Sequence, residues 1–247
     1  MKIIAHRGAS GTEIENTLVA FEQAIIEGCD GIELDIQYHP SGEFFLLHDS
    51  YIDYQGQTTH LHALSVEQIA AVRLKNKAPI ATLTQAFNTI GSRCPINIEI
   101  KSSSLFTSAC INGYVDEMLT LLDHQINQAI AQNLICPTKL SISSFNHKVL
   151  KQVAKRLPNI SLGALTASCP NDLAKFGQVL ACQSVNPAID CITKDFVDDA
   201  HQRGLLVWVY TVNNPQDIAL CNSLNVDAIF TDFPEKSRAI FNQIRQT

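Results

Sequence analysis

Two short apolar segments of the sequence each carry a pair of charged residues spaced two apart. Glu33 and Asp35 lie within GIELDIQ, and Glu99 and Lys101 lie within INIEIK. If both segments are strands, residues two apart share a face, and the three carboxylates then crowd together. Crowded carboxylates repel each other, and a hard divalent cation, Mg²⁺ or Ca²⁺, is the simplest partner for them. The alternatives are a solvated strand end or a structural ion pair with Arg7 or Lys101.

Two histidines and two cations supply the other parts of a phosphoryl-transfer site. His6 and Arg7 follow the first apolar segment, and His48 follows a later one. Histidines on opposite sides of a phosphorus atom can deliver one proton and remove another. Arg7 can grip phosphate oxygens with two hydrogen bonds, while Lys101 acts as a point charge. With a metal that polarises a phosphoryl oxygen, this set indicates phosphodiester cleavage, although either histidine alone is more typical of a core or capping position.

The elements that carry these residues alternate between strands and helices. Strands are expected at residues 2–5, 31–37, 96–101, 140–144, 161–165, 184–187, 205–212 and 228–231. Helical spacing is found at residues 18–28, 65–73, 82–90, 113–132, 146–156, 173–180, 193–203, 215–224 and 234–244. A helical crossover makes the next strand parallel, and eight such steps favour a closed (β/α)8 TIM barrel over an open doubly wound sheet. The reactive groups should then lie at the carboxyl ends of the strands.

A small insertion is expected after the second strand, over about residues 37–80. It includes a strand at residues 43–48, which the turn formers Pro40–Gly42 join to the second barrel strand. The remainder is less regular, apart from the helical piece at residues 65–73. His39, His60 and His62 fall within this segment, and we expect them on the surface.

Composition sets the class of protein. The 247 residues are 46% hydrophobic and 17% charged, which suits a single domain over residues 1–247. The net charge of −6 argues against nucleic acid or an anionic membrane as a partner. The N-terminus does not resemble a signal peptide, and no apolar run is long enough for a membrane anchor. We therefore expect a cytoplasmic protein whose eight cysteines are reduced.

The order of the short motifs resembles the glycerophosphodiester phosphodiesterase family, in its cytoplasmic bacterial type. The resemblance covers essentially the whole chain. It rests on HRG at His6–Gly8, ENT at Glu15–Thr17, ExD at Glu33–Asp35, HD at His48–Asp49, ExK at Glu99–Lys101 and DAIFTDFP at Asp227–Pro234. It implies a barrel with a small insertion that hydrolyses glycerophosphodiesters to an alcohol and glycerol 3-phosphate, in lipid and glycerol metabolism.

The resemblance also implies a role for each matching residue. Glu33, Asp35 and Glu99 would hold Mg²⁺ or Ca²⁺, and His6 and His48 would be the general acid and base. The substrate would be a small molecule. The resemblance does not say which histidine is the acid, or what the oligomeric state is.

The phosphate would contact Arg7 and Lys101, and Glu15 would orient Arg7. Asn16 and Thr17 could either support the site or cap the helix that follows them, and we favour the cap. Where the family usually has WTVN, this chain has Tyr210–Asn213, with Trp208 two residues earlier on the same strand face. Tyr210 and Trp208 are therefore the expected aromatic contacts of the substrate at the barrel mouth. The insertion also departs from the family, because it has Gly56–His60 in place of the common Arg-Thr-Thr-Asn-Gly.

Two other functions fit parts of the same pattern. A lysophospholipase D-like phosphodiesterase acting on lipids would need an apolar rim or a membrane anchor, and the sequence shows neither clearly. A non-catalytic barrel that binds a phosphodiester would be expected to lack one of the two histidines or a metal-binding acid. His6, His48 and the three acids are all present, which favours the enzyme.

Overall fold

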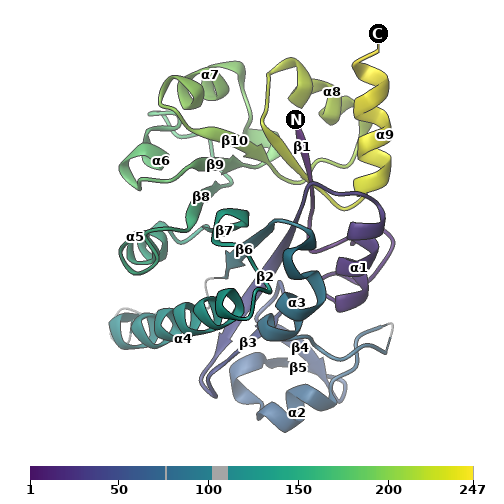
Figure 1. The fold of residues 1–247 in the computed structure, drawn as a ribbon, viewed down its shortest axis with the longest axis vertical. Coiled ribbons are helices and arrows are strands. Elements are labelled where there is room, and N and C mark those ends of the chain that lie inside the picture. The colour runs from purple at the N-terminus through teal and green to yellow at the C-terminus, as the bar shows by residue number, and fades with distance from the viewer. Residues whose placement is uncertain (76, 102–110, 247) are drawn as a thin grey trace.

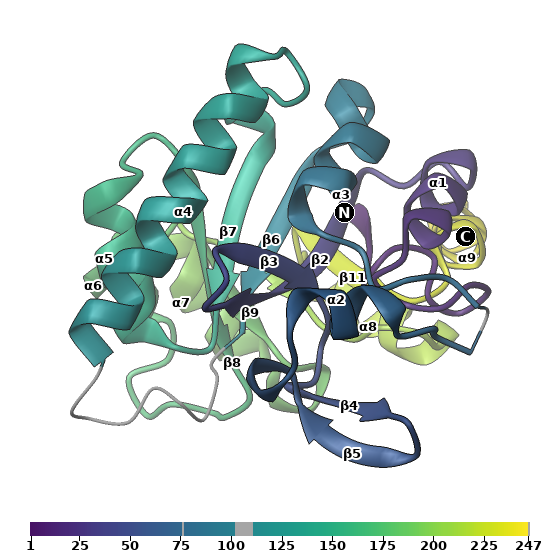
Figure 2. The same cartoon turned by 90° about the horizontal axis from the view of Figure 1, so that it is seen from below.

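The computed structural model describes residues 1–75, 77–101 and 111–246. Within them, eight parallel strands form a closed barrel, because β1 pairs with β11 on one side and with β2 on the other (Figures 1 and 2). The strands are β1 Lys2–Ala5, β2 Gly31–His39, β6 Ile96–Ile100, β7 Leu140–Ser144, β8 Ser161–Thr166, β9 Ser184–Pro187, β10 Leu206–Val209 and β11 Ala228–Thr231. The expected TIM barrel is confirmed, and the seventh strand is shorter than expected.

Helices surround the barrel on its outer side (Figure 1). They are α1 Leu18–Ile26, α3 Leu83–Ile90, α4 Ile111–Ala131, α5 His147–Arg156, α6 Lys175–Val179, α7 Lys194–Gln202, α8 Pro215–Ser223 and α9 Pro234–Ile244. Side-chain caps begin several of them; Thr17 caps α1, and Thr82 with Gln85 forms a capping box on α3. No helix in the described ranges is both long and apolar enough to cross a membrane.

The core lies between the strands and these helices. Ile32, Leu34 and Ile36 of β2 are almost wholly buried in one cluster with Phe21 of α1 and Phe87 of α3. Since side chains alternate along a strand, burying these isoleucines and the leucine on the helix side turns the residues between them into the barrel. The core packing of β2 therefore fixes the direction in which its acids point.

The insertion forms a small layer of its own beside the barrel. Strand β3, Glu43–Leu46, pairs antiparallel with β2 as expected, and α2, Val66–Ala71, matches the expected helical piece. A hairpin of β4, Tyr51–Tyr54, and β5, Gln57–His60, was not expected. Its two-residue turn has positive φ angles at Gln55 and Gly56, the backbone form that suits a tight hairpin.

Of the three histidines of this region, His39 is buried and His60 and His62 are partly buried, which corrects the expectation that all three lie on the surface. His39 is only 5% exposed, and the rings of His39 and His60 lie 5.7 and 5.0 Å from that of His62. Two hydrogen bonds cross between the insertion and β2: His62 Nε2 donates to Tyr38 O at 2.7 Å, and His39 Nε2 donates to Leu64 O at 3.1 Å. The prediction failed because a neutral imidazole can donate to a backbone carbonyl that has no backbone partner in the irregular insertion.

The cysteines in the described part of the chain are free thiols. Cys29, Cys94, Cys136, Cys169, Cys182, Cys191 and Cys221 make up this set, and Cys110 lies outside the described residues. Cys29 Sγ and Cys94 Sγ lie 3.6 Å apart, where α1 and α3 run side by side.

The histidines make the attachment of the insertion sensitive to acid. Burial lowers the pKa of His39 and of His62 below the usual value of about 6.5. The unfolded chain then binds more protons than the folded chain below about pH 6.5, so stability falls as the pH drops. We expect urea midpoints to fall between pH 7 and pH 5 in the wild type, and to fall less in His39→Gln.

His124 is exposed on α4 and provides the matched control. His124→Gln should keep the pH dependence of the wild type. If His39→Gln also keeps it, His39 does not carry the acid sensitivity.

Candidate active site

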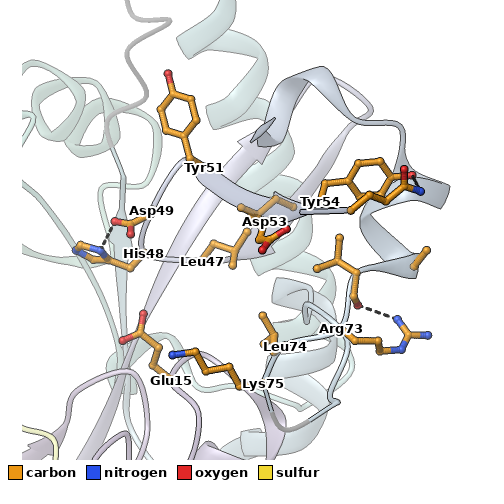
Figure 3. Close-up of a pocket in the computed structure, with 14 residues that line it drawn as sticks. Glu15, Leu47, His48, Asp49, Tyr51, Asp53, Tyr54, Arg73, Leu74 and Lys75 are labelled. Atoms are coloured by element: carbon orange, nitrogen blue, oxygen red, sulfur yellow. Dashed lines mark hydrogen bonds and ion pairs between the residues drawn. The ribbon is translucent and has the colours of Figure 1, made fainter. Parts of the chain in front are cut away.

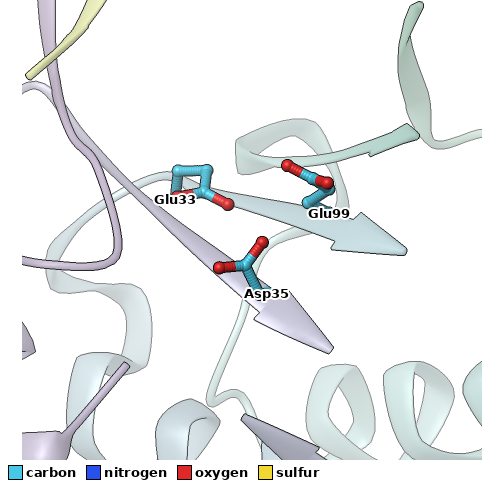
Figure 4. A group of neighbouring side chains, drawn as sticks. All are labelled: Glu33, Asp35 and Glu99. Atoms are coloured by element: carbon cyan, nitrogen blue, oxygen red, sulfur yellow. The ribbon is translucent and has the colours of Figure 1, made fainter. Parts of the chain in front are cut away.

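Three carboxylates meet inside the barrel near the carboxyl ends of β2 and β6. The strand register pairs Asp35 with Glu99, and Glu33 lies two residues before Asp35 on the same face (Figure 4). One oxygen from each of the three groups lies within 4.8 Å of the others, and all three residues are buried. The sequence pattern therefore brings together the acids that it predicted as metal ligands.

Two cations lie against the carboxylates. Arg7 Nε lies 3.1 Å from Asp35 Oδ2, and Lys101 Nζ lies 2.7 Å from Glu99 Oε1 and 3.3 Å from Asp35 Oδ1. The structural ion pairs considered from the sequence are thus present. They leave three carboxylates facing two cations, so the cluster keeps one excess negative charge when all of them are ionised.

Glu33 is the acid whose ionisation this excess negative charge opposes most. Burial, together with repulsion from Asp35 and Glu99, holds the pKa of Glu33 well above its usual range. Burial also raises the pKa of Asp35, but attraction to Lys101 and Arg7 outweighs it and leaves that pKa below the usual value. Glu33 Oε1 is buried and has no hydrogen-bond partner. An oxygen-lined site with an orphaned carboxylate oxygen fits a hard divalent cation.

A sharp loop after β1 holds Arg7 in this position. Arg7 and Gly8 both have positive φ angles, and a Cβ on Gly8 would lie 2.7 Å from the backbone of Ala20 in α1. Only glycine permits this approach. The Arg7 backbone N–H donates to Glu33 Oε2 at 2.8 Å, and Arg7 Nη1 lies 2.9 Å from Glu15 Oε2. Glu15 therefore contacts Arg7, the residue that it was predicted to orient.

Asn16 belongs to the site, although the sequence suggested that it belonged to the helix cap. Its Nδ2 donates to Asp35 Oδ2 at 2.9 Å, and its Oδ1 accepts the backbone N–H of Asp35 at 3.0 Å. Thr17 caps α1 instead. Asn16 is 2% exposed and has a positive φ of 56°, a conformation that asparagine tolerates better than most residues. It fixes the Asp35 carboxylate on the side opposite Lys101.

The two histidines are held in different ways. His6 Nδ1 lies 2.7 Å from Asp232 Oδ1, whose other oxygen accepts Asn213 Nδ2 at 2.6 Å. Burial raises the pKa of Asp232, but the hydrogen bonds from His6 and Asn213 keep that pKa below its usual value. His48 Nδ1 lies 2.8 Å from Asp49 Oδ1, and the Asp49 side chain is 79% exposed. The sequence placed Asp232 and Asn213 at strand ends but did not predict that they orient His6.

A pocket of about 180 Å³ joins these groups. It is lined by His6, Arg7, Glu33, His48, Asn97, Glu99, Lys101, Ser143, Phe145, Leu165, Tyr210, Thr211 and Phe230. One side carries the charged groups, and the other is largely apolar, with the Phe145 and Tyr210 rings 5.7 Å apart edge to face. The pocket can thus receive a molecule with an anionic group at one end and a short carbon skeleton at the other.

Trp208 lies outside this pocket, so the structure does not bring it together with the other residues that were predicted to contact the substrate. It lines a separate cavity with Lys2 and Leu206, at the amino-terminal end of the strands. Phe230 lies next to both: its ring centroid is 6.0 Å from that of Trp208, and it lines the first pocket together with Tyr210. Residues two apart on a strand share a face but lie about 6.6 Å apart along the strand. The spacing of Trp208 and Tyr210 therefore identified their shared face, but it did not show that they lie in different layers of the barrel.

Comparison with known proteins identifies a family and relatives of this chain. The sequence profile of the Glycerophosphoryl diester phosphodiesterase family matches residues 6–236. A glycerophosphodiester phosphodiesterase of Bacillus altitudinis is 28% identical, and the similarity covers 99% of each chain. That of Caldanaerobacter subterraneus is 29% identical, over 99% of this chain and 98% of the relative.

Solved structures share the fold. A phosphodiesterase of Oleispira antarctica, in complex with its product sn-glycerol-3-phosphate, superposes with a TM-score of 0.85 at 22% identity, over 98% of this chain and 97% of that one. A glycerophosphodiester phosphodiesterase of Parabacteroides distasonis gives 0.83 at 21% identity, over 100% and 98%. From the profile match over most of its length, the chain belongs to the glycerophosphoryl diester phosphodiesterase family of enzymes.

Proposed function

We propose that the protein hydrolyses glycerophosphodiesters to an alcohol and glycerol 3-phosphate, with the help of a divalent cation and two histidines. The observation that carries this proposal is the buried trio of carboxylates with its orphaned Glu33 oxygen, because two of the three, Glu33 and Glu99, line one pocket with His6 and His48. The named relatives and the product bound to the Oleispira antarctica enzyme support glycerol 3-phosphate as the product. We also retain the expectation of a cytoplasmic location.

Glu33, Asp35 and Glu99 would hold the cation, Mg²⁺ or Ca²⁺, through carboxylate oxygens. When bound, the cation would polarise a phosphoryl oxygen and offset developing negative charge. Its positive charge would also favour the ionised form of Glu33, which burial and repulsion disfavour in the chain alone. Glu33, whose ionised form burial and repulsion disfavour, is therefore the carboxylate that a bound cation would stabilise most.

The chain's own residues would bind the phosphate and move the protons. Arg7 and Lys101 line the pocket, and both hold positive charge beside the carboxylates. The glycerol skeleton would pack on Phe145, Tyr210 and Phe230. Asp232 accepts the Nδ1 proton of His6, which leaves His6 Nε2 available to take or give a proton.

The cation requirement is tested with Glu33→Gln, which keeps the shape of the side chain and removes its charge. At a hundred times its Kd, a cation stabilises the folded protein by about 2.7 kcal/mol, or roughly 5–10 °C in Tm for a chain of this size. We expect Mg²⁺ or Ca²⁺ to raise the Tm of the wild type and not that of the variant. In EDTA the variant should be the more stable of the two, because the repulsion is relieved.

The same proteins are assayed for release of glycerol 3-phosphate from glycerophosphocholine and glycerophosphoethanolamine, with a coupled dehydrogenase. Product should require the cation and disappear in Glu33→Gln. Glu117→Gln, the same change on the exposed face of α4, should behave as the wild type. Product that persists both in EDTA and in Glu33→Gln would contradict the metal site, while the hydrolytic function would stand.

The orientation of His6 is tested with Asp232→Asn. Asn213 donates to Asp232 Oδ2, so the new amide would present its carbonyl to Asn213 and its NH₂ to His6. His6 would then adopt the other tautomer and carry its proton on Nε2. We expect kcat to fall by about a hundredfold or more, as wrong-tautomer substitutions do in catalytic triads.

Asp227→Asn is the matched control, because Asp227 Oδ2 pairs with His201 Nε2 at 2.9 Å outside the pocket. That variant should keep the kcat of the wild type. A kcat for Asp232→Asn within twofold of the wild type, in a folded protein, would remove the positioning role of Asp232.

A further inference from the structure

Two free thiols lie in contact at the amino-terminal side of β2 and β6. Cys29 precedes β2, Cys94 precedes β6, and their Sγ atoms are 3.6 Å apart. A disulfide needs about 2.05 Å between the sulfur atoms, so the two have to approach each other by about 1.5 Å. The carboxylate cluster lies toward the carboxyl ends of the same strands, so both thiols lie apart from the candidate active site.

The segments that carry the thiols are fixed to each other on both sides of the pair. Arg93 donates to both carboxylate oxygens of Glu22 in α1, at 3.0 and 2.6 Å. On the other side, the backbone N–H of Ile32 in β2 donates to Pro95 O at 2.9 Å. The fold therefore holds the two sulfur atoms close to bonding distance.

The surroundings of the pair favour ionisation of Cys94. Its hydrogen bond with Cys29 lowers the pKa of Cys94, and the charge of Lys139 lowers it further, while burial opposes both. The same hydrogen bond and burial raise the pKa of Cys29 above its usual value. Because the thiolate is the nucleophilic form of cysteine, Cys94 is the sulfur that attacks and Cys29 is its neutral partner.

A small cavity reaches Cys94 from the surface. Cys94 itself is 5% exposed, whereas Ser92 and Lys139 on the cavity wall are exposed. The cavity has a volume of about 10 Å³, roughly the space that one water molecule requires. A hydroperoxide is a small, uncharged oxidant that suits such a space, and a bulky disulfide such as oxidised glutathione does not.

We propose that Cys94 is a site of oxidation by hydroperoxides, and that Cys29 converts its oxidised form to a disulfide. The Cys94 thiolate attacks one oxygen of hydrogen peroxide; an S–O bond forms, the O–O bond breaks, and the other oxygen leaves as hydroxide and takes up a proton. The Cys29 sulfur then attacks the sulfenic acid; the S–S bond forms, the S–O bond breaks, and the hydroxyl leaves as water with the Cys29 proton. Two thiols are oxidised, and one peroxide is reduced to two water molecules.

The disulfide closes a loop around the insertion. Residues 29–94 include β2, the insertion and His48, whose ring pairs with Asp49 (Figure 3). A covalent link between the ends of this segment restricts the unfolded chain more than the folded one, so it stabilises the folded protein. The catalytic groups lie at the other ends of the strands, so the bond should leave their arrangement unchanged.

The test treats the folded, reduced protein with hydrogen peroxide, blocks the remaining thiols and maps linked peptides by mass spectrometry. The wild type should form the Cys29–Cys94 disulfide before the exposed Cys169 is oxidised. Cys29→Ser should leave Cys94 as a sulfenic acid, which dimedone traps. Cys94→Ser should give no dimedone adduct at Cys29, because the attacking thiolate is missing.

Cys136→Ser is the matched control, because Cys136 is the other thiol on the wall of the small cavity. This variant should form the Cys29–Cys94 disulfide as the wild type does. Thermal unfolding of the same samples measures the consequence of the bond. Oxidation should raise the Tm of the wild type by about 5 °C or more, dithiothreitol should reverse the rise, and Cys29→Ser should show none.

Each other outcome counts against a specific claim. Oxidation of Cys169 ahead of Cys94, or a Cys29–Cys94 bond that forms only in urea, would overturn the reactive site. A peptide that links Cys94 to a thiol other than Cys29, or an adduct at Cys29 in Cys94→Ser, would overturn the roles of the two sulfurs. An unchanged Tm with the bond in place would remove its stabilising effect and leave the oxidation site.

Discussion

The repulsion among Glu33, Asp35 and Glu99 is the constraint around which the active end of this barrel is organised. Breaking a buried ion pair by removing one partner costs about 3–5 kcal/mol, so three buried acids require compensation in the folded chain. Arg7 and Lys101 supply most of it. These two cations are also the groups proposed to bind phosphate. The stability of the folded chain and its proposed affinity for a phosphate therefore depend on the same two side chains.

Barrel closure brings distant parts of the sequence into this site. β1 pairs with β11 as well as with β2, so His6 meets Asp232 across 226 positions of sequence and Arg7 meets Glu33 on the other side. An open sheet would separate its first and last strands and leave His6 without its carboxylate. Closure of the sheet is thus a requirement of the site, in addition to being a way to bury the strands.

The sequence was sufficient to predict the features that follow from periodicity and from the ends of strands. Alternation along β2 and β6 gave the inward acids, and the regular helical crossovers gave the barrel. It missed contacts set by depth or by loop conformation. The spacing of Trp208 and Tyr210 identified a shared face, but only the packing of Phe230 shows which ring reaches the pocket. Asn16 looked like part of a cap because its bonds to Asp35 depend on a positive φ that no local pattern specified.

The two histidines lie on different parts of the chain: His6 lies on the rigid barrel, and His48 lies on a part that can adjust. His6 is tied to Asp232 at the end of a barrel strand, whereas His48 comes from the insertion and pairs with an exposed carboxylate. The insertion has its own small core, including Phe45, Leu61 and Ile69. Hydrogen bonds at His39 and His62 attach it to β2. Segments with separate cores open locally at lower free energy than the domain unfolds, and opening here would withdraw His48 while leaving the carboxylate cluster and His6 in place. Sequence change in the insertion would therefore alter the position of His48, one of the two proposed catalytic histidines, without disturbing the carboxylate cluster inside the barrel.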